Sequence, residues 1–207
     1  MILEACVESF EEAVNAEARG ANRIELCDDL STGGLTPSYA LLESVKRKLN
    51  IPIMVMIRPR GGNFIYDSME LKQMKQNIDI CKSLDVAGVV FGLLDDRNTV
   101  DVKNTTLLAE YASPLEITFH KAIDDTPDLL ESVEILLRIE GITRILTSGG
   151  QATASEGARM INKMSQAAGN RLKILAAGKI TRQNLTELSG ILQVDEFHGR
   201  KIVGDLK

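Results

Sequence analysis

Two Glu-x-Cys units, at residues 4–6 and 25–27, each combine a carboxylate with a thiol at a spacing that allows the two groups to act together. Within each unit the carboxylate and the thiol are two positions apart, so on a β-strand they point to the same face. A helix-like segment separates the units, which is the layout of two parallel strands joined by a crossover helix. We therefore expect Cys6 and Cys27 to lie close together at the carboxyl ends of neighbouring strands.

These two thiols indicate a site for a soft metal ion. Cys6 and Cys27 offer sulfur ligands, and Met56 on the next predicted strand offers a third. Two or three sulfur ligands suit Cu(I) better than a hard cation. The alternative is that both cysteines are small buried apolar side chains, as free cysteines often are. Cys81 lies within a predicted helix and is expected to be structural.

Acid–base chemistry is the second possibility that the residue types raise. Both histidines end predicted strands, and a carboxylate on the same inward face can partner either one. The candidate catalytic residues are Glu25, His120, Glu196 and His198. The alternative is that each histidine is satisfied by backbone groups, which would make it a structural residue.

Basic and glycine-rich loops after three predicted strands indicate binding of an anion. Backbone N–H groups in such loops, near the starts of helices, accept phosphate or carboxylate groups. At Gly149 an ordinary turn is an equally good explanation. The candidate ligand-binding residues are Glu4, Arg58, Arg60, Ser148, Gly149 and Gly178.

The guanidinium of Arg58 is expected to bridge the carboxylates of Glu4 and Glu25. Two carboxylates on adjacent strands repel each other, which raises the pKa of at least one, whereas a nearby arginine lowers it. Because arginine is always charged and can bridge both groups, we expect Glu25 to stay ionised at neutral pH. The alternative is an ion-pair network around Arg58 that only holds the strands together. Lys121 has outward parity, so Lys179 is the better candidate for an exposed amine.

Strand and helix patterns alternate along the whole chain. Strands are predicted at 2–6, 23–27, 52–58, 87–93, 115–120, 144–147, 172–177 and 194–198, and helices at 9–19, 36–49, 67–84, 102–111, 126–141, 153–168 and 181–188. This alternation predicts an α/β fold, a (βα)8 TIM barrel, as a single domain over residues 1–207. The chain ends soon after His198, so we expect the eighth helix to be short or absent and that side of the barrel to be thin. A doubly wound open sheet is the alternative.

The composition is that of a soluble globular protein of 207 residues, with 44% hydrophobic and 26% charged residues. The net charge of −5 argues against nucleic acid or an anionic membrane surface as a partner. We find neither a signal peptide nor an apolar stretch of about 18 residues, so no membrane association is expected. Three cysteines do not make a disulfide framework and suit a reducing compartment, so a cytoplasmic location is expected.

Short motifs are spread over the chain from residue 3 to residue 199: LEAC at 3–6, RIELC at 23–27, GGLTP at 33–37, VMIRPRGG at 55–62, GVVFG at 88–92, TFHKA at 118–122, RILTSG at 144–149 and EFHG at 196–199. Together these motifs resemble the CutC family of copper homeostasis proteins. The resemblance implies a cytoplasmic (βα)8 barrel that is associated with copper and often dimeric, so a homodimer is expected.

Two functions are therefore predicted. The first is copper homeostasis of the CutC type, with Cu(I) held by Cys6 and Cys27 at the ends of the first two strands. The alternative is a TIM-barrel enzyme of lyase or isomerase type that acts on a small phosphorylated or carboxylated metabolite. The expected ligand is accordingly a copper ion or a small anionic metabolite, and no nucleotide cofactor motif is evident.

Overall fold

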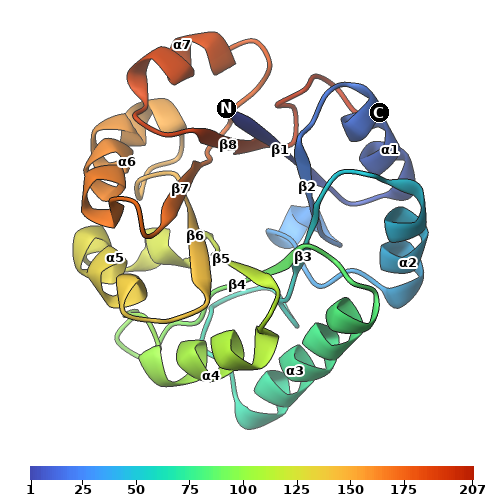
Figure 1. The fold of residues 1–207 in the computed structure, drawn as a ribbon. Helices are drawn as coiled ribbons and strands as arrows, with labels where there is room; N and C mark the ends of the chain where they lie inside the picture. Colours follow the sequence, from blue (N-terminus) through green and yellow to red (C-terminus); the bar gives the residue numbers. More distant parts are fainter.

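The chain forms a closed barrel of eight parallel strands ringed by helices (Figure 1). The computed structural model describes residues 1–207. Each strand pairs with the next in sequence, and β8 pairs back with β1. The predicted TIM barrel is confirmed, and because the sheet has no free edge the open-sheet alternative is excluded.

All eight strands are short, and each of the first seven is followed by an α-helix. The strands are β1 Ile2–Val7, β2 Arg23–Leu26, β3 Ile53–Met56, β4 Gly88–Phe91, β5 Glu116–Phe119, β6 Ile142–Thr147, β7 Lys173–Ala176 and β8 Glu196–Gly199. The helices are α1 Phe10–Ala18, α2 Tyr39–Lys48, α3 Ser68–Ser83, α4 Val102–Ala112, α5 Leu129–Leu137, α6 Ala154–Ala168 and α7 Leu185–Ile191, with 3₁₀ turns at Leu30–Thr32 and Lys121–Asp125. None of these helices has the length and apolar character that crossing a bilayer requires.

Side-chain caps fix where several helices begin. The Ser9 hydroxyl accepts a hydrogen bond from the backbone N–H of Glu12 at the start of α1. At the start of α3, Asp67 and Glu70 form a reciprocal capping box. These contacts satisfy N–H groups that have no partner within the helix, so each helix starts at a fixed distance above its strand.

Alternation along the strands separates an apolar outer face from a polar interior. Outward residues such as Ala5, Ile24 and Val55 are fully or almost fully buried in the large core between strands and helices. In the register of β1 and β2, Glu4 lies opposite Arg23, and Cys6 lies opposite Glu25. Because of this register, the side chains of the two strands interleave in layers inside the barrel.

A non-helical segment after β8 closes the side of the barrel that was expected to be thin. Ile202, Val203 and Leu206 are buried in the main core. The carbonyl oxygen of Leu206 also accepts a hydrogen bond of 2.9 Å from the Asn15 side chain on α1. In Figure 1 the C-terminus lies beside α1. The eighth helix is absent, as expected, but this segment covers the junction between β8 and β1.

The start of α6 approaches the loop after β6 very closely. A Cβ atom added at Gly157 would lie 1.9 Å from the carbonyl oxygen of Ser148, whereas one at Gly190 in α7 would meet nothing within 4 Å. Only glycine therefore allows α6 to pack at this distance, which fixes the position of the loop at 148–150.

We predict opposite effects for Gly157→Ala and Gly190→Ala. Alanine favours a helix over glycine by up to about 1 kcal/mol, so Gly190→Ala should raise the free energy of unfolding. Gly157→Ala should lower it by about 1–3 kcal/mol, because the new methyl group overpacks the helix against backbone. Urea unfolding midpoints of both variants measure the effects. A Gly157→Ala protein as stable as the Gly190→Ala protein would contradict the close packing.

Candidate functional site

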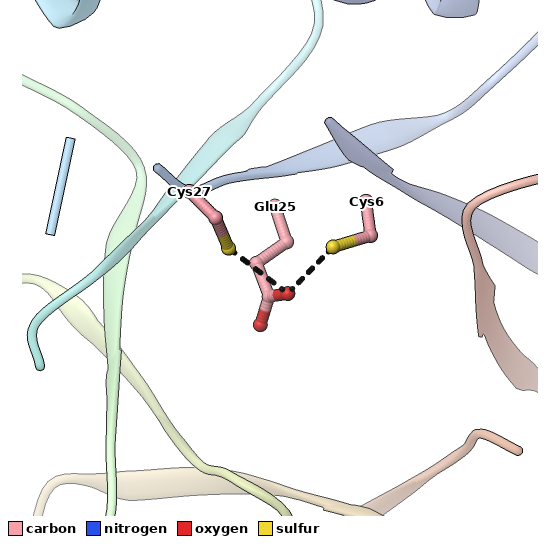
Figure 2. Close-up of side chains that lie close together, drawn as sticks. All are labelled: Cys6, Glu25 and Cys27. Atoms are coloured by element: carbon pink, nitrogen blue, oxygen red, sulfur yellow. Dashed lines mark hydrogen bonds between the residues drawn. The ribbon is translucent and has the colours of Figure 1, made fainter. Parts of the chain in front are cut away.

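The thiols of Cys6 and Cys27 both face one oxygen of the Glu25 carboxyl group (Figure 2). The Oε2 atom lies 3.3 Å from Cys6 Sγ and 3.5 Å from Cys27 Sγ. The ligand atoms of the three residues lie within 4.8 Å of one another. The expected proximity of the two cysteines is therefore confirmed, with Glu25 between them rather than one layer below.

His198, at the end of the barrel where β8 meets β1, joins this cluster to a second carboxylate. Its Nδ1 atom is 2.8 Å from Glu4 Oε1, and its Nε2 atom is 3.7 Å from Glu25 Oε2. Glu4, Glu25 and His198 are a second group whose potential ligand atoms lie within 4.8 Å of one another. The imidazole thus links the thiol cluster to the charged residues deeper in the barrel.

Below the thiols, a ladder of alternating charges crosses the barrel interior. Arg23 on β2 forms ion pairs with Glu4 and, at 2.6 Å, with Glu196 on β8. Glu196 is also paired, at 2.7 Å, with Arg144 on β6. Arg144 continues the ladder to Glu116 on β5, at 3.1 Å. We call the series His198–Glu4–Arg23–Glu196–Arg144–Glu116 the charge ladder.

The residue that bridges the interior carboxylates is Arg23, and not Arg58 as expected. Arg58 donates hydrogen bonds to the backbone carbonyl oxygens of Thr32, Gly34 and Gly62, at 3.0, 3.2 and 2.8 Å. Arg58 lies beyond the end of β3, where the chain turns away and the alternation of the strand no longer fixes its direction.

Arginine and histidine determine the protonation states at the upper end of the ladder. Burial would raise the pKa of Glu4, but the hydrogen bond to His198 and the charge of Arg23 outweigh it and lower the pKa to about 2. Burial would lower the pKa of His198, whereas the Glu25 charge and contacts with Cys6 and Glu4 raise it well above its ordinary value. At neutral pH, Glu4 is an anion and His198 an imidazolium cation.

The three groups of the thiol cluster share a single negative charge. A hydrogen bond with Cys27 lowers the pKa of the Cys6 thiol to about 5 despite its burial, and His198 adds to the effect. The contact with Cys6, followed by burial, raises the pKa of Cys27 well above its ordinary value. Burial and the neighbouring Cys6 charge raise the pKa of Glu25 in the same way. Our expectation of an ionised Glu25 is therefore wrong, because no arginine reaches it and the charge resides on Cys6.

A cavity of about 470 Å³ opens above the cluster, at the carboxyl ends of the strands. Cys6, Glu25 and His198 line it on one side, and Arg58 and His120 line it on another. This is the end of the barrel where active sites of the fold are built, and the volume suits a small molecule. The predicted candidates Glu4 and Glu196 do not line the cavity, because both lie in the charge ladder beneath it.

The predicted anion loop after β6 is already occupied by a carboxylate of the chain itself. Asp124 accepts hydrogen bonds of 2.9 Å from the backbone N–H groups of both Ser148 and Gly150. Gly149 donates its N–H to the Thr147 hydroxyl at 2.9 Å. Gly178 packs against the start of α6, where an added Cβ would lie 2.8 Å from the backbone nitrogen of Ala154. The N–H groups of Ser148, Gly149 and Gly150 are therefore not free for an external phosphate.

Two basic residues lie elsewhere than the sequence indicated. Arg60 does not line the cavity and pairs, at 2.5 Å, with Glu70 at the start of α3. Lys121 does line the cavity, where its ammonium group contacts Asp124 and Ser148. The outward parity assigned to Lys121 was wrong because the residue starts a 3₁₀ turn after β5. Lys179 does not line the cavity.

Sequence reasoning missed Arg23, Arg144 and Asp124 as parts of the site. Arg23 is two residues before Glu25, so strand parity alone places it on the inward face. Arg144 is two residues before Leu146, which lines the cavity, so the same parity argument places Arg144 on the inward face. Asp124 lies in a 3₁₀ turn and meets its partners 24 residues later in the chain, so no local pattern marks it.

Comparisons with known proteins agree on one family. A sequence model of the CutC family matches residues 1–203. The human protein named copper homeostasis protein cutC homolog is 42% identical over 197 residues, covering 95% of this chain and 72% of its own. A family protein CutC from Histophilus somni is 40% identical over 198 residues, covering 96% of this chain and 81% of its own.

Solved structures confirm the fold over almost the whole chain. The CutC crystal structure from Streptococcus agalactiae superposes with a TM-score of 0.92 at 32% identity, covering 98% of this chain and 99% of that one. The aldolase QR15 gives a TM-score of 0.69 at 13% identity, covering 100% of this chain and 92% of that one, a likeness that concerns the barrel fold alone.

We predict that Arg23→Ala lowers the free energy of unfolding by about 3–5 kcal/mol, because it leaves the buried Glu4 and Glu196 carboxylates without their shared cation. Arg47→Ala is the matched control. It removes the exposed partner of Glu43 and should cost less than about 0.5 kcal/mol. Denaturant unfolding of both variants gives the two values. Equal, small losses would show that the ladder does not stabilise the barrel.

Stability should fall in mild acid because of His120. Burial and the charge of Arg58 lower the pKa of this histidine to about 3. Between the ordinary histidine pKa near 6.5 and this lowered pKa, the unfolded chain binds a proton and the folded chain does not. The free energy of unfolding therefore decreases as the pH is lowered through this window. The loss should be about 2 kcal/mol by about pH 5.

His120→Asn isolates this contribution. Asparagine does not titrate. As a favoured capping residue it can also accept the hydrogen bond from the Ala122 N–H, which His120 Nδ1 accepts in the wild type. Free energies of unfolding from about pH 7 to about pH 5 should decrease less steeply for the variant than for the wild type. Parallel curves for the two proteins would contradict a neutral, buried His120.

Proposed function

The chain belongs to the CutC family, and from this premise we propose that it functions in copper homeostasis by binding Cu(I) between the thiolates of Cys6 and Cys27. The observation that supports the proposal most directly is the pairing of two buried free thiols on neighbouring strands, around one carboxyl oxygen. A metal–thiolate bond is about 2.3 Å long for zinc, so two thiolates on opposite sides of such an ion are about 4.6 Å apart. The ligand atoms here, within 4.8 Å of one another, fit that requirement.

The surroundings of the thiols are rich in sulfur. Cys6 and Cys27 belong to a small buried cluster with Met54, Met56 and Val90. Thiolate and thioether groups select Cu(I) over hard cations, which prefer oxygen ligands. Met56 was predicted as a third sulfur ligand, and its place in this cluster supports that role.

The net charge of the buried groups favours binding of a monovalent cation. The charge ladder consists of oppositely charged neighbours, from the His198–Glu4 pair to the Arg144–Glu116 pair, so its own charges cancel. The charge left over is the thiolate of Cys6, whose low pKa makes it ionised at neutral pH. A singly charged ion compensates one thiolate. When Cys27 also ionises as a ligand, the two thiolates with Cu(I) carry one net negative charge, which is stabilised by its closeness to the imidazolium of His198, although Glu4 already balances that cation.

Glu25 lies beside the path by which an ion enters the site. Binding of a metal by a thiol releases its proton, and because the Glu25 carboxyl group already holds a proton, the proton of Cys27 must leave through the cavity to solvent. The Glu25 carboxyl group contacts both thiols and also lines the cavity, through which an ion reaches Cys6. Cys27 itself is fully buried, so the ion must arrive from the Cys6 side.

The proposal includes the setting in which the protein works. We propose a cytoplasmic protein, since the three free cysteines suit a reducing compartment. We also propose a homodimer of single-domain chains, supported by the resemblance to the family.

We predict that the protein binds one equivalent of Cu(I) under reducing conditions and that a Cys6→Ser, Cys27→Ser double variant does not. Serine keeps the size of the side chain and removes the soft ligand. Competition with a chromophoric Cu(I) chelator measures the affinity. Cys81→Ser is the control, because this third thiol lies apart in the helix-packed core and burial raises its pKa to about 12. Equal, weak competition by all three proteins would refute the proposal.

A further inference from the structure

His120 carries an unpaired hydrogen-bond donor at the cavity. Its Nδ1 atom accepts a hydrogen bond of 3.2 Å from the backbone N–H of Ala122, so this nitrogen bears no proton. The neutral ring must then carry its proton on Nε2. Nε2 is buried and has no partner in the protein. A buried donor without a partner is costly and rare, so such a group marks a place for an acceptor from outside the chain.

Arg58 supplies a positive charge that no side chain of the protein balances. The residue is only 5% exposed. Its hydrogen bonds go to backbone carbonyl oxygens, it forms no ion pair, and its buried Nε atom, like the nearby Tyr66 hydroxyl, makes no hydrogen bond of ordinary geometry. Buried charges are otherwise paired or bound to an ion of opposite sign. The backbone contacts hold the guanidinium rigidly, which prepares it for an anion.

Phe64 connects these two groups in the cavity wall. Its ring centroid is 4.9 Å from the Arg58 guanidinium carbon and 4.8 Å from the centroid of the His120 ring. The two donor nitrogens are buried, so side chains of this wall, Phe64 among them, have to shift before a ligand reaches them. Phe64 lies in the loop between β3 and α3, which is where such movement is easiest in a barrel.

We infer that this side of the cavity binds a small carboxylate-bearing molecule, with a carboxylate oxygen accepting the His120 Nε2–H and the Arg58 guanidinium balancing the charge. The site extends from the end of β3, beside the thiol pair on β1 and β2, to the end of β5, and Arg58 contacts the same residue, Gly34, that packs against Cys27. It is thus a second binding function, distinct from the copper site.

The available donors favour a carboxylate over a phosphate. A phosphate group is usually held by several backbone N–H groups at a glycine-rich loop. In this barrel the corresponding amides of Ser148 and Gly150 are occupied by Asp124. One imidazole N–H and one guanidinium suffice for the two oxygens of a carboxylate. A cavity of about 470 Å³ accommodates a molecule of several carbon atoms.

Binding of pyruvate, malonate and inorganic phosphate to the metal-free protein tests the inference, with calorimetric titration at constant ionic strength. At least one of the two carboxylates should bind more tightly than phosphate. His120→Asn keeps the acceptor for Ala122 and removes the Nε2 donor, so it should weaken carboxylate binding about tenfold or more. His120→Gln places an amide N–H near Nε2 and should bind better than His120→Asn although it loses the cap.

Arg200→Gln is the control for charge alone. This residue lines the same cavity but pairs with Glu8, and it contacts neither donor. Its carboxylate affinity should stay within about twofold of the wild type. Three results would overturn the inference: no binding of either carboxylate, tighter binding of phosphate, or undiminished affinity in His120→Asn. Because no copper is present, none of these results bears on the copper site.

Discussion

The alternating charges inside the barrel are the interaction on which the rest of the structure depends. A TIM barrel is usually filled with branched aliphatic side chains, whereas here Glu4, Arg23, Glu196 and Arg144 occupy the interior. Each charge alone would cost several kcal/mol to bury, and each is tolerated because its neighbours have the opposite sign. The ladder draws on β1, β2, β8 and β6, so it couples strands that are far apart in sequence. The interior is thereby polar on the side of these strands, whereas Met54, Met56 and Val90 on β3 and β4 make another side of it apolar.

The upper end of this ladder determines the chemistry of the thiols. Glu4 holds His198 as a cation, and His198 in turn favours an anion at Cys6. Arg23 on the same strand pairs with Glu4 and Glu196, so no arginine pairs with Glu25 and its carboxyl group retains a proton between the two thiols. The two sulfur atoms, one already ionised and both next to methionine, are the ligands that we propose for a soft cation. The neighbouring wall of the cavity has the reverse polarity, with a cationic Arg58 and a neutral His120.

The alternation of strand and helix patterns was sufficient to predict the barrel, and the parity of residues along each strand was sufficient to predict the inward direction of its polar residues. Glu4, Cys6, Glu25 and His198 were all placed correctly on the inner face, because side chains in a strand alternate strictly. Parity cannot give the register between strands, which puts Arg23 beside Glu4. It also fails beyond the strand ends, where Arg58 turns to backbone carbonyls and Lys121 turns into the cavity. Errors about where a side chain points thus concern residues that loops position, whereas Arg23 and Arg144 were missed although strand parity places both on the inner face.

We propose that Cys6 and Cys27 together hold Cu(I) by sulfur alone, above a ladder that keeps His198 charged. X-ray absorption spectroscopy of the protein loaded with one equivalent of Cu(I) tests this directly, because it distinguishes sulfur from nitrogen or oxygen neighbours. We expect sulfur-only coordination of low number, since the nearby imidazole is a cation and cannot bind a metal. A spectrum with nitrogen or oxygen ligands, or one that survives loss of both thiols, would contradict it.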